Sequence, residues 1–474
     1  MTEILRPDIC VIGAGSGGLA VAAAAAAFGV PVVLIEKGTM GGNRLNAGCV
    51  PSKALIAAAR RAQIARGSAG FGVNAGGVTV DFGAVQDHVQ GVIKAIAPND
   101  SRQRFTGLGV RVIGGEARFK DRRTVAVGAT EIMARRFVIA TGSVPAIPQV
   151  DGLDSVPYLT TETIFALREC PQHLIVIGAG PIGLECAQAF HRLGAAVTVL
   201  EPGEPLAKED SECAATVVDR LEREGVAIRS GISIARVGHS GSNVKAVLKN
   251  GSSEEVITAS HIFVDAGRRA DVGNLGLEAA GIRHDENGIA VNKGLRTGNR
   301  RVYAIGDAAG GVQFAHLADY HAGLAVRNAL FRLPVAVNND IVPRVTFTDP
   351  ELAHVGLDES AARKRHTTIR VLRWPFYDND RAQIERDTAG HIKVVTTKNG
   401  KILGATIVGK DAGELIASWA LACSQGINIR HVAGMILPYP TRSEAGKRAA
   451  IDFFGRSLTS PWVRRIIGWL RRFG

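Results

Sequence analysis

The sequence predicts an α/β protein in which two domains with parallel sheets are followed by a C-terminal α+β domain. Two similar segments, Asp8–Gly18 and His173–Gly183, each contain a short apolar run, the pattern GxGxxG and a following helical stretch. From about Ile341 onward, apolar runs alternate with turns, and Lys398–Gly400 between two of these runs is typical of a hairpin. A helix is predicted over Leu415–Cys423. At 474 residues, the chain is long enough for several domains.

Each GxGxxG segment has the pattern of a dinucleotide-binding unit. Gly13 allows a tight turn after the strand, Gly15 lets the backbone approach a pyrophosphate, and Gly18 lets the helix pack closely on the strand. The helix N-terminus then offers N–H groups to the phosphates. The next strand ends in Glu36, a residue type that accepts hydrogen bonds from ribose hydroxyls. The second copy repeats the pattern with the same spacing in Gly178, Gly180, Gly183 and Glu201. Two complete copies predict two Rossmann-like domains, each with its own dinucleotide.

The charge and cysteine content exclude several classes of protein. The net charge of +12 is accompanied by only 5% aromatic residues and by no basic run with interleaved aromatics, so nucleic acid is not an expected partner. The phosphates of two dinucleotides account for part of this charge. The six cysteines are scattered without a CxxC pair, which predicts no disulfide framework and no metal site and fits a reducing cytoplasm. The N-terminus runs into an apolar strand pattern rather than a signal peptide.

Two further segments end predicted strands with small or polar residues. These are Arg136–Ser143 and Arg301–Asp307. Asp307 follows Gly306 directly after the second apolar run, where a carboxylate is well placed to bind a sugar-like chain. The alternative is that Asp307 is a simple helix N-cap.

The order of these motifs resembles the class I pyridine nucleotide-disulfide oxidoreductases, the FAD flavoproteins that include dihydrolipoamide dehydrogenase, glutathione reductase and mercuric reductase. The resemblance rests on GAGSGG, LNAGCVPSK, ATGS, GAGPIG, AGRR, AIGD and PT-x-SE, and it covers roughly residues 5–455. It implies an FAD-binding domain that begins with residues 1–150 and an NAD(P)-binding domain at 151–271. It also implies a central domain at 272–340 that completes the FAD site, a dimerisation domain at 341–455, and a homodimer.

The resemblance also assigns roles to single residues. The ADP half of FAD is expected at the first glycine motif and Glu36, and its ribityl chain at Asp307. Lys53 is expected near the flavin N5 in a pair with Glu185. Because Glu201 would repel a 2′-phosphate, NADH is favoured over NADPH as the second cofactor. The implied cofactor-binding residues are Gly13, Gly15, Gly18, Glu36, Lys37, Gly42, Lys53, Thr141, Gly142, Gly178, Gly180, Gly183, Glu201, Gly267, Arg268, Gly306, Asp307 and His316. The implied catalytic residues are Cys49, Lys53, Glu185, Tyr439 and Glu444.

Two positions depart from the family pattern. The redox motif of the family has two cysteines five residues apart, and here the second is Cys49, while Arg44 stands at the position of the first. The C-terminal catalytic histidine is replaced by Tyr439, although Glu444 remains. A tyrosine does not readily carry a proton at neutral pH, so we expect Tyr439 to cap the site structurally. Both departures predict that the dithiol chemistry is lost.

The exchange of a sulfur for a guanidinium has two interpretations. One hypothesis is that Arg44 favours the thiolate form of Cys49 beside the flavin, or attracts an anionic acceptor. The other is that Cys49 is retained for packing while Arg44 is a solvated surface residue.

The C-terminal tail, residues 456–474, is predicted to be a basic amphipathic segment. Over residues 461–474, apolar side chains fall on one helical arc and four arginines on the other. This pattern suits an anionic membrane surface or a membrane-protein partner, which would make the protein peripheral at the inner face of the membrane. The alternative is a helix that packs on its own dimer.

The predicted function is that of an FAD-dependent NAD(P)H oxidoreductase. Hydride passes from NAD(P)H to FAD, and the electrons continue to a small acceptor such as a quinone. One alternative is a disulfide or dithiol reductase in which Cys49 acts with an external thiol. Another is a flavin-bound redox sensor or membrane-associated partner with little turnover.

Overall fold

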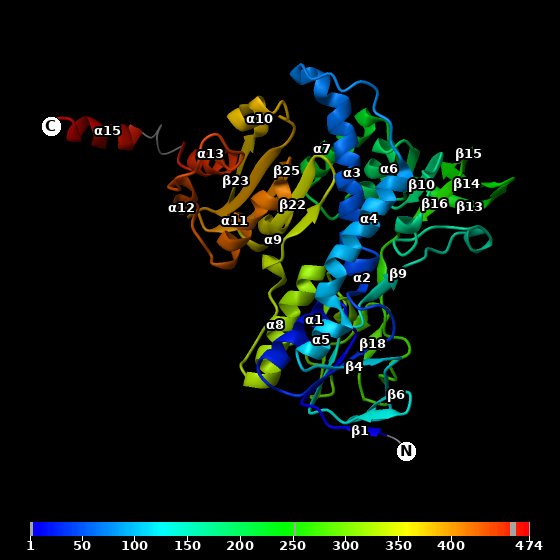
Figure 1. The fold of residues 1–474 in the computed structure, drawn as a ribbon. Helices are drawn as coiled ribbons and strands as arrows, with labels where there is room; N and C mark the ends of the chain where they lie inside the picture. Colours follow the sequence, from blue (N-terminus) through cyan, green and yellow to red (C-terminus); the bar gives the residue numbers. More distant parts are fainter. Residues whose placement is uncertain (1–2, 251–252, 456–460, 474) are drawn as a thin grey trace. The chain divides into compact units, whose positions relative to one another are not determined.

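The computed structural model describes residues 3–250, 253–455 and 461–473 (Figure 1). It divides into two compact units. Unit 1 comprises Met1–Gly178, Ala189–Pro202 and Ile232–Val337. Unit 2 comprises Ala179–Gln188, Gly203–Gly231 and Asn338–Gly474. The predicted domain boundaries at residues 150, 271 and 340 remain predictions.

Unit 1 is built around a five-stranded parallel sheet with the strand order β20-β8-β2-β3-β4. Its strands are β2 (Ile9–Ile12), β3 (Val32–Glu36), β4 (Arg111–Gly114), β8 (Arg136–Ile139) and β20 (Val302–Ala304). Ile9 and Val11 belong to the hydrophobic core on one face of the sheet, and Cys10 and Ile12 belong to the core on the other. Both faces are therefore covered, which is why the strands read as continuous apolar runs.

Helices of unit 1 connect and cover this sheet. The alanine-rich run after the first glycine motif forms α1 (Ser16–Ala27), which packs against α8 (Ala315–Phe331). The remaining helices are α2 (Gly42–Asn46), α3 (Cys49–Gly67), α4 (Phe82–Ile96) and α5 (Arg102–Gly107), with short 3₁₀ turns at η1 (Ser68–Phe71), η2 (Ala97–Asp100), η3 (Leu153–Ser155), η4 (Ile164–Ala166) and η5 (Gly306–Ala309).

Further strands of unit 1 form the second predicted βαβ unit and several small sheets. In the second unit, β10 (His173–Ile177) pairs in parallel with β11 (Ala196–Glu201) and β16 (His261–Val264). An antiparallel sheet contains β13 (Ser233–Ser240), β14 (Asn243–Asn250) and β15 (Ser253–Ala259). The small sheets contain β1 (Glu3–Leu5), β5 (Arg118–Phe119), β6 (Val125–Val127) and β7 (Thr130–Ile132); β9 (Ser143–Pro145) and β17 (Arg268–Ala270); and β18 (His284–Asp285) and β19 (Gly288–Ile289).

Unit 2 contains the antiparallel sheet that the C-terminal pattern predicts, with the order β21-β22-β25-β24-β23. Its strands are β21 (Arg344–Thr346), β22 (Glu351–Gly356), β23 (Ile369–Pro375), β24 (His391–Thr397) and β25 (Ile402–Gly409). The predicted hairpin joins β24 to β25, and the predicted helix is α11 (Ala412–Ser424). The remaining elements are α7 (Ser211–Glu224), β12 (Ala227–Ser230), η6 (Asn339–Ile341), α9 (Glu359–Arg365), η7 (Phe376–Asp378), α10 (Asp380–Ile384), α12 (Ile429–Ala433), α13 (Glu444–Asp452) and α15 (Pro461–Leu470). The division between the units falls within α6 (Pro181–Arg192).

The predicted fold class is confirmed: parallel α/β sheets precede a C-terminal antiparallel sheet with helices. Among the described residues, no helix is both long enough and apolar enough to cross a membrane.

Candidate active site

The first glycine motif forms the tight turn between β2 and α1 that the sequence predicts. Gly13 has a φ of +102°, and a Cβ there would lie 2.4 Å from the carbonyl oxygen of Ala140. A Cβ on Gly18 would lie 1.9 Å from the carbonyl oxygen of Gly13. Both positions therefore exclude a side chain. No acidic residue lies in the first turn of α1, so the positive end of its dipole is available to a phosphate.

Glu36, at the end of β3, is held by backbone N–H groups of two neighbouring loops. Glu36 accepts hydrogen bonds from the backbone N–H groups of Ala14 at 2.6 Å and Gly38 at 2.8 Å. It lines a cavity of about 60 Å³ that Gly13 and Thr141 also line. The buried hydroxyl of Thr141 has no hydrogen-bond partner among the described residues. An orphaned hydroxyl beside a glycine cradle fits the polar edge of a dinucleotide, because buried polar groups are normally paired.

Lys37 lies on the rim of the same cavity and is already paired. Its ammonium group is 2.8 Å from the carboxylate of Asp271, which also lines the cavity. The hydrogen bond to Asp271 raises the pKa of Lys37, so this side chain stays charged. The Lys37–Asp271 ion pair therefore lines the same cavity as Gly13, and it carries no net charge of its own.

A network around Ser143 connects three segments of unit 1 close to the predicted ribityl site. The Ser143 hydroxyl donates to the carboxylate of Asp307 at 2.5 Å, and Arg268 donates to the same hydroxyl at 2.7 Å. Asn43 donates to the Ser143 carbonyl at 2.8 Å. Asp307 lies in η5 just after β20, and Ile305 rather than Asp307 is the N-cap of this turn. The structure thus contradicts the N-cap alternative for Asp307.

Glycines bring α2 against the first glycine motif. Gly42 has a φ of +57°, and a Cβ there would lie 2.8 Å from the Cα of Gly15. A side chain at this position would separate the two segments. The predicted cofactor residues Gly13, Gly15 and Gly42 are therefore brought together at one end of the parallel sheet.

Arg44 projects from α2 and is bound to an acid that the sequence reasoning did not single out. Its Nη2 is 2.6 Å from Oδ2 of Asp100, while its buried Nε has no hydrogen-bond partner among the described residues. Asp319 on α8 lies within electrostatic reach of Arg44 and Asp100, and burial raises the pKa of Asp319. Arg44 is half-buried and paired, which contradicts the interpretation of a solvated surface residue.

Cys49 and Lys53 lie in the first two turns of α3. Cys49 is the first residue of this helix and its side chain is exposed, with Gly48 as N-cap. All six cysteines of the chain are described, and all six are free. That Cys49 has no sulfur partner within the chain stays a prediction.

The second glycine motif repeats the geometry of the first. Gly178 has a φ of +111°, and a Cβ there would lie 2.2 Å from the carbonyl oxygen of Asp265. Gly180 directly precedes α6, and Gly183 lies in its first turn. Glu201 is the last residue of β11. Gly267 lies between β16 and β17 with a φ of +102°. This motif therefore has the strand–turn–helix context that its predicted role requires.

Glu185 is buried on α6 and has a backbone partner within unit 2. Its Oε1 accepts a hydrogen bond from the N–H of Phe347 at 2.8 Å. Lys53 belongs to unit 1 and Glu185 to unit 2, so their pairing stays a prediction.

The two predicted C-terminal residues have separate partners. Tyr439 is 71% exposed and donates from its hydroxyl to Asp380 at 2.8 Å, a hydrogen bond that raises the pKa of Tyr439. Glu444 begins α13 and accepts from the N–H of Thr441 at 3.3 Å. A tyrosine held in this way retains its proton, so this geometry provides no base at neutral pH.

Two histidines occupy the N-terminal half of α8. His316 stacks on Phe314, with ring centroids 5.2 Å apart. His321 is buried, and its Nδ1 accepts a hydrogen bond from the N–H of Gly306 at 3.2 Å. Burial lowers the pKa of His321, which fits this neutral, accepting form. His321 thus fixes the backbone of the predicted cofactor residue Gly306 through a hydrogen bond, a role that the sequence does not reveal.

Comparison with known proteins identifies the family. The model of the pyridine nucleotide-disulphide oxidoreductases matches residues 7–322, and the model of their dimerisation domain matches residues 342–450. The chain belongs to the pyridine nucleotide-disulphide oxidoreductases.

Individual oxidoreductases of this family match over nearly the whole chain. Mercuric reductase from Lysinibacillus sphaericus is 34% identical over 449 residues, which cover 94% of this chain and 82% of the relative. Dihydrolipoyl dehydrogenase from Thermus scotoductus is 37% identical over 450 residues, which cover 94% and 96%. The structure of the Cu(II) complex of the HOCl-induced flavoprotein disulfide reductase RclA from Escherichia coli matches with a TM-score of 0.84 and 26% identity. That match covers 96% of this chain and 100% of the other.

Membership of this oxidoreductase family confirms the general prediction of an FAD-dependent enzyme that uses NAD(P)H. The dimerisation domain indicates a homodimer. The residues that sequence reasoning missed are Asp100, Asp271 and Asp319. They come from three separate segments that carry no motif, and only the fold brings them close to the predicted site residues.

Proposed function

We propose that this oxidoreductase passes electrons from NADH through FAD to a small acceptor such as a quinone, without a redox-active disulfide. The observation that carries the proposal is Arg44 at the position where the family motif has its first cysteine. Cys49 forms no disulfide, and Arg44 is held by Asp100 instead of exchanging with a substrate sulfur. Tyr439 in place of the catalytic histidine supports the same conclusion, because without a dithiol no thiol proton needs a base.

In this proposal, the residues around the first glycine motif bind FAD. FAD, when bound, accepts two electrons as a hydride and releases them to the acceptor. Gly13, Gly15 and the N-terminus of α1 would hold its pyrophosphate, and Thr141 offers a hydroxyl that lacks a partner. Asp307, oriented by Ser143, would bind the ribityl chain.

NADH is the proposed donor because Glu201 ends β11 next to the second glycine motif. A carboxylate there would accept hydrogen bonds from both ribose hydroxyls and repel a 2′-phosphate. We expect kcat/KM to be higher for NADH than for NADPH, and Glu201→Ala to reduce that ratio. A ratio that the substitution leaves unchanged would contradict this role.

Steady-state oxidation of NADH with different acceptors tests the proposed function. Menadione should support turnover and lipoamide should not. Rapid reduction of lipoamide by the purified enzyme without an added thiol would exclude the proposal.

A second candidate function is a disulfide reductase in which Cys49 acts with an external thiol. It is favoured by the exposure of Cys49 at the start of α3, where the helix dipole places partial positive charge beside the sulfur. Lipoamide or disulfide turnover that appears only when a thiol such as glutathione is added, and is lost in Cys49→Ser, would support this second function.

The C-terminal helix α15 is proposed to dock on an anionic membrane surface. None of its residues is buried, and Trp462 and Phe473, the latter just after the helix, are 70% and 71% exposed. Four arginines, Arg464, Arg465, Arg471 and Arg472, form no ion pair with the described residues. Exposed aromatic side chains beside arginines that have no ion pair within the described part of the chain match the chemistry of an anionic bilayer surface.

A further inference from the structure

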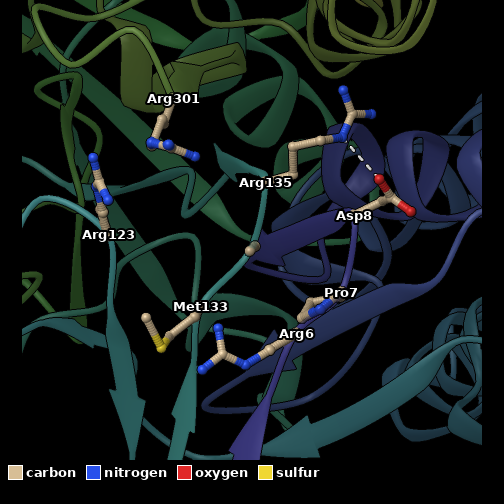
Figure 2. Close-up of a pocket in the computed structure, with 8 residues that line it drawn as sticks. Arg6, Pro7, Asp8, Arg123, Met133, Arg135 and Arg301 are labelled. Atoms are coloured by element: carbon tan, nitrogen blue, oxygen red, sulfur yellow. Dashed lines mark hydrogen bonds and ion pairs between the residues drawn. The ribbon is translucent and has the colours of Figure 1, made fainter.

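A second pocket in unit 1 is lined by four arginines and lies apart from the predicted cofactor residues. It has a volume of about 350 Å³ and includes Arg6, Arg123, Arg135, Arg301 and Asp8 in its wall. Figure 2 shows the four side chains around this pocket, with the carboxylate of Asp8 turned toward Arg135. This volume falls within the range of small-molecule sites, which is roughly 300–1,000 Å³.

The pocket and the predicted flavin residues lie at opposite edges of the parallel sheet. Asp8, Arg135 and Arg301 each stand just before the first residue of a strand, namely β2, β8 and β20. Gly13 and Thr141 follow the last residues of β2 and β8. Because these strands are parallel, the two sets are separated by the length of a strand, roughly 13 Å for four residues.

Backbone hydrogen bonds make the wall of the pocket rigid. The N–H of Arg135 donates to the carbonyl of Pro7 at 3.1 Å, and the N–H of Phe137 donates to the carbonyl of Arg301 at 2.9 Å. The N–H of Met133 donates to the carbonyl of Leu5 at 2.8 Å. The arginines therefore project from a fixed scaffold, which lowers the ordering cost when a ligand binds.

The charges of the pocket do not balance. Four arginines against one aspartate leave three positive charges in excess. Asp8 is 2.8 Å from Arg135, whereas Arg6, Arg123 and Arg301 take part in none of the ion pairs among the described residues. Gathered cations of this kind repel one another unless an anion neutralises them.

We propose that this pocket binds a small organic phosphate that carries at least two negative charges. Guanidinium groups match phosphate oxygens in bidentate geometry, and three of the four are uncommitted. Pro7, Met133 and Ala134 in the wall offer an apolar surface for the carbon part of such a ligand. The site is distinct from both glycine motifs.

Calorimetric titration of the FAD-loaded enzyme with inorganic pyrophosphate, at low ionic strength and in saturating NAD⁺, tests this site. NAD⁺ occupies the predicted nicotinamide site and so removes pyrophosphate binding there. We expect saturable binding of one pyrophosphate per chain that the double variant Arg123→Gln/Arg301→Gln weakens at least tenfold. Arg301→Lys should give an intermediate loss, because it keeps the charge but not the bidentate geometry.

Arg61→Gln is the matched control, because Arg61 is an exposed arginine on α3 outside the pocket. It should bind pyrophosphate like the wild type. FAD content and circular dichroism show whether each variant is folded. If the double variant does not fold, the single variant Arg123→Glu replaces it in the titration, because Arg123 is exposed and its substitution should not disturb the fold. The proposal is overturned if pyrophosphate does not bind saturably, if NAD⁺ abolishes the binding, or if folded pocket variants bind with unchanged affinity.

Discussion

Arg44 and Asp100 form an ion pair, with Nη2 2.6 Å from Oδ2. The Arg44 side chain is 34% exposed and that of Asp100 only 10%. Nearby Asp319 adds a second acid whose pKa is raised by burial. The proposed loss of dithiol chemistry rests on this charged cluster around Arg44, the residue that we propose replaces the first redox cysteine of the family.

Removing both partners of this ion pair should destabilise the protein by less than the sum of the two single removals. Asp100→Ala leaves a partly buried guanidinium without its acceptor, which should cost about 1–3 kcal/mol of unfolding free energy. The double variant Arg44→Ala/Asp100→Ala should lose less than the sum of the two single variants. Urea denaturation of the FAD-loaded proteins measures the losses in the single variants and in the double variant. Strictly additive losses would mean that the ion pair contributes nothing.

Gly13→Ala should abolish FAD binding. The new Cβ would meet the carbonyl of Ala140 at 2.4 Å, in a backbone conformation that alanine rarely adopts. The flavin absorbance per chain after purification measures the loss. Gly91→Ala on α4 is the control, because a Cβ there meets nothing within 4 Å, and FAD content should be unchanged. A normal flavin content in a folded Gly13→Ala variant would contradict the assigned role of this turn.

Acidification should destabilise the antiparallel sheet of unit 2 through His354. This residue is buried in β22 with hydrogen bonds to Thr406 and Gly356, and burial lowers the pKa of His354 from 6.5 to about 4. The unfolded chain therefore binds a proton between pH 6.5 and 4 while the folded chain does not. The contribution of neutral His354 to the free energy of unfolding is fully present above pH 6.5. It falls by about 3 kcal/mol as the pH drops toward 4.

The matched variant His354→Asn removes this titration. Its unfolding midpoint in urea should depend less on pH between 6.5 and 4 than that of the wild type. Equal pH dependence in the two proteins would mean that His354 is not the titrating group.

The tail makes a separate prediction about membranes. Full-length protein should sediment with vesicles that contain anionic phosphatidylglycerol, and a chain that ends at residue 455 should stay in the supernatant. Replacing all four tail arginines by glutamine should weaken the binding and its salt dependence. Equal sedimentation of full-length and truncated protein would support the alternative, a tail that packs on its own dimer.

The sequence predicted those features that depend on local chemistry. Both glycine motifs require backbone conformations that other residues rarely adopt, so Gly13 and Gly178 could be assigned to turns before the structure was known. The alternation of apolar residues and the Lys398–Gly400 turn likewise predicted the antiparallel sheet of unit 2.

Long-range pairs could not be predicted in this way. Asp100 meets Arg44 across 56 residues, and Asp307 meets Ser143 across 164 residues. The arginine pocket is a further example, because Arg6 and Arg301 are distant in the chain and meet only where parallel strands begin at one edge of the sheet. Such contacts follow from topology and carry no local pattern.

Anaerobic titration of the purified enzyme with NADH, followed by menadione or lipoamide, tests the central claim most directly. The account predicts that two electrons reduce each flavin fully, that menadione reoxidises it rapidly and that lipoamide does not. The variant Arg44→Cys should be titrated in parallel. A disulfide between residue 44 and Cys49 in this variant should raise the uptake to four electrons. Uptake of four electrons by the wild-type enzyme, with reduction of lipoamide, would show that a second sulfur works with Cys49 and would contradict the account.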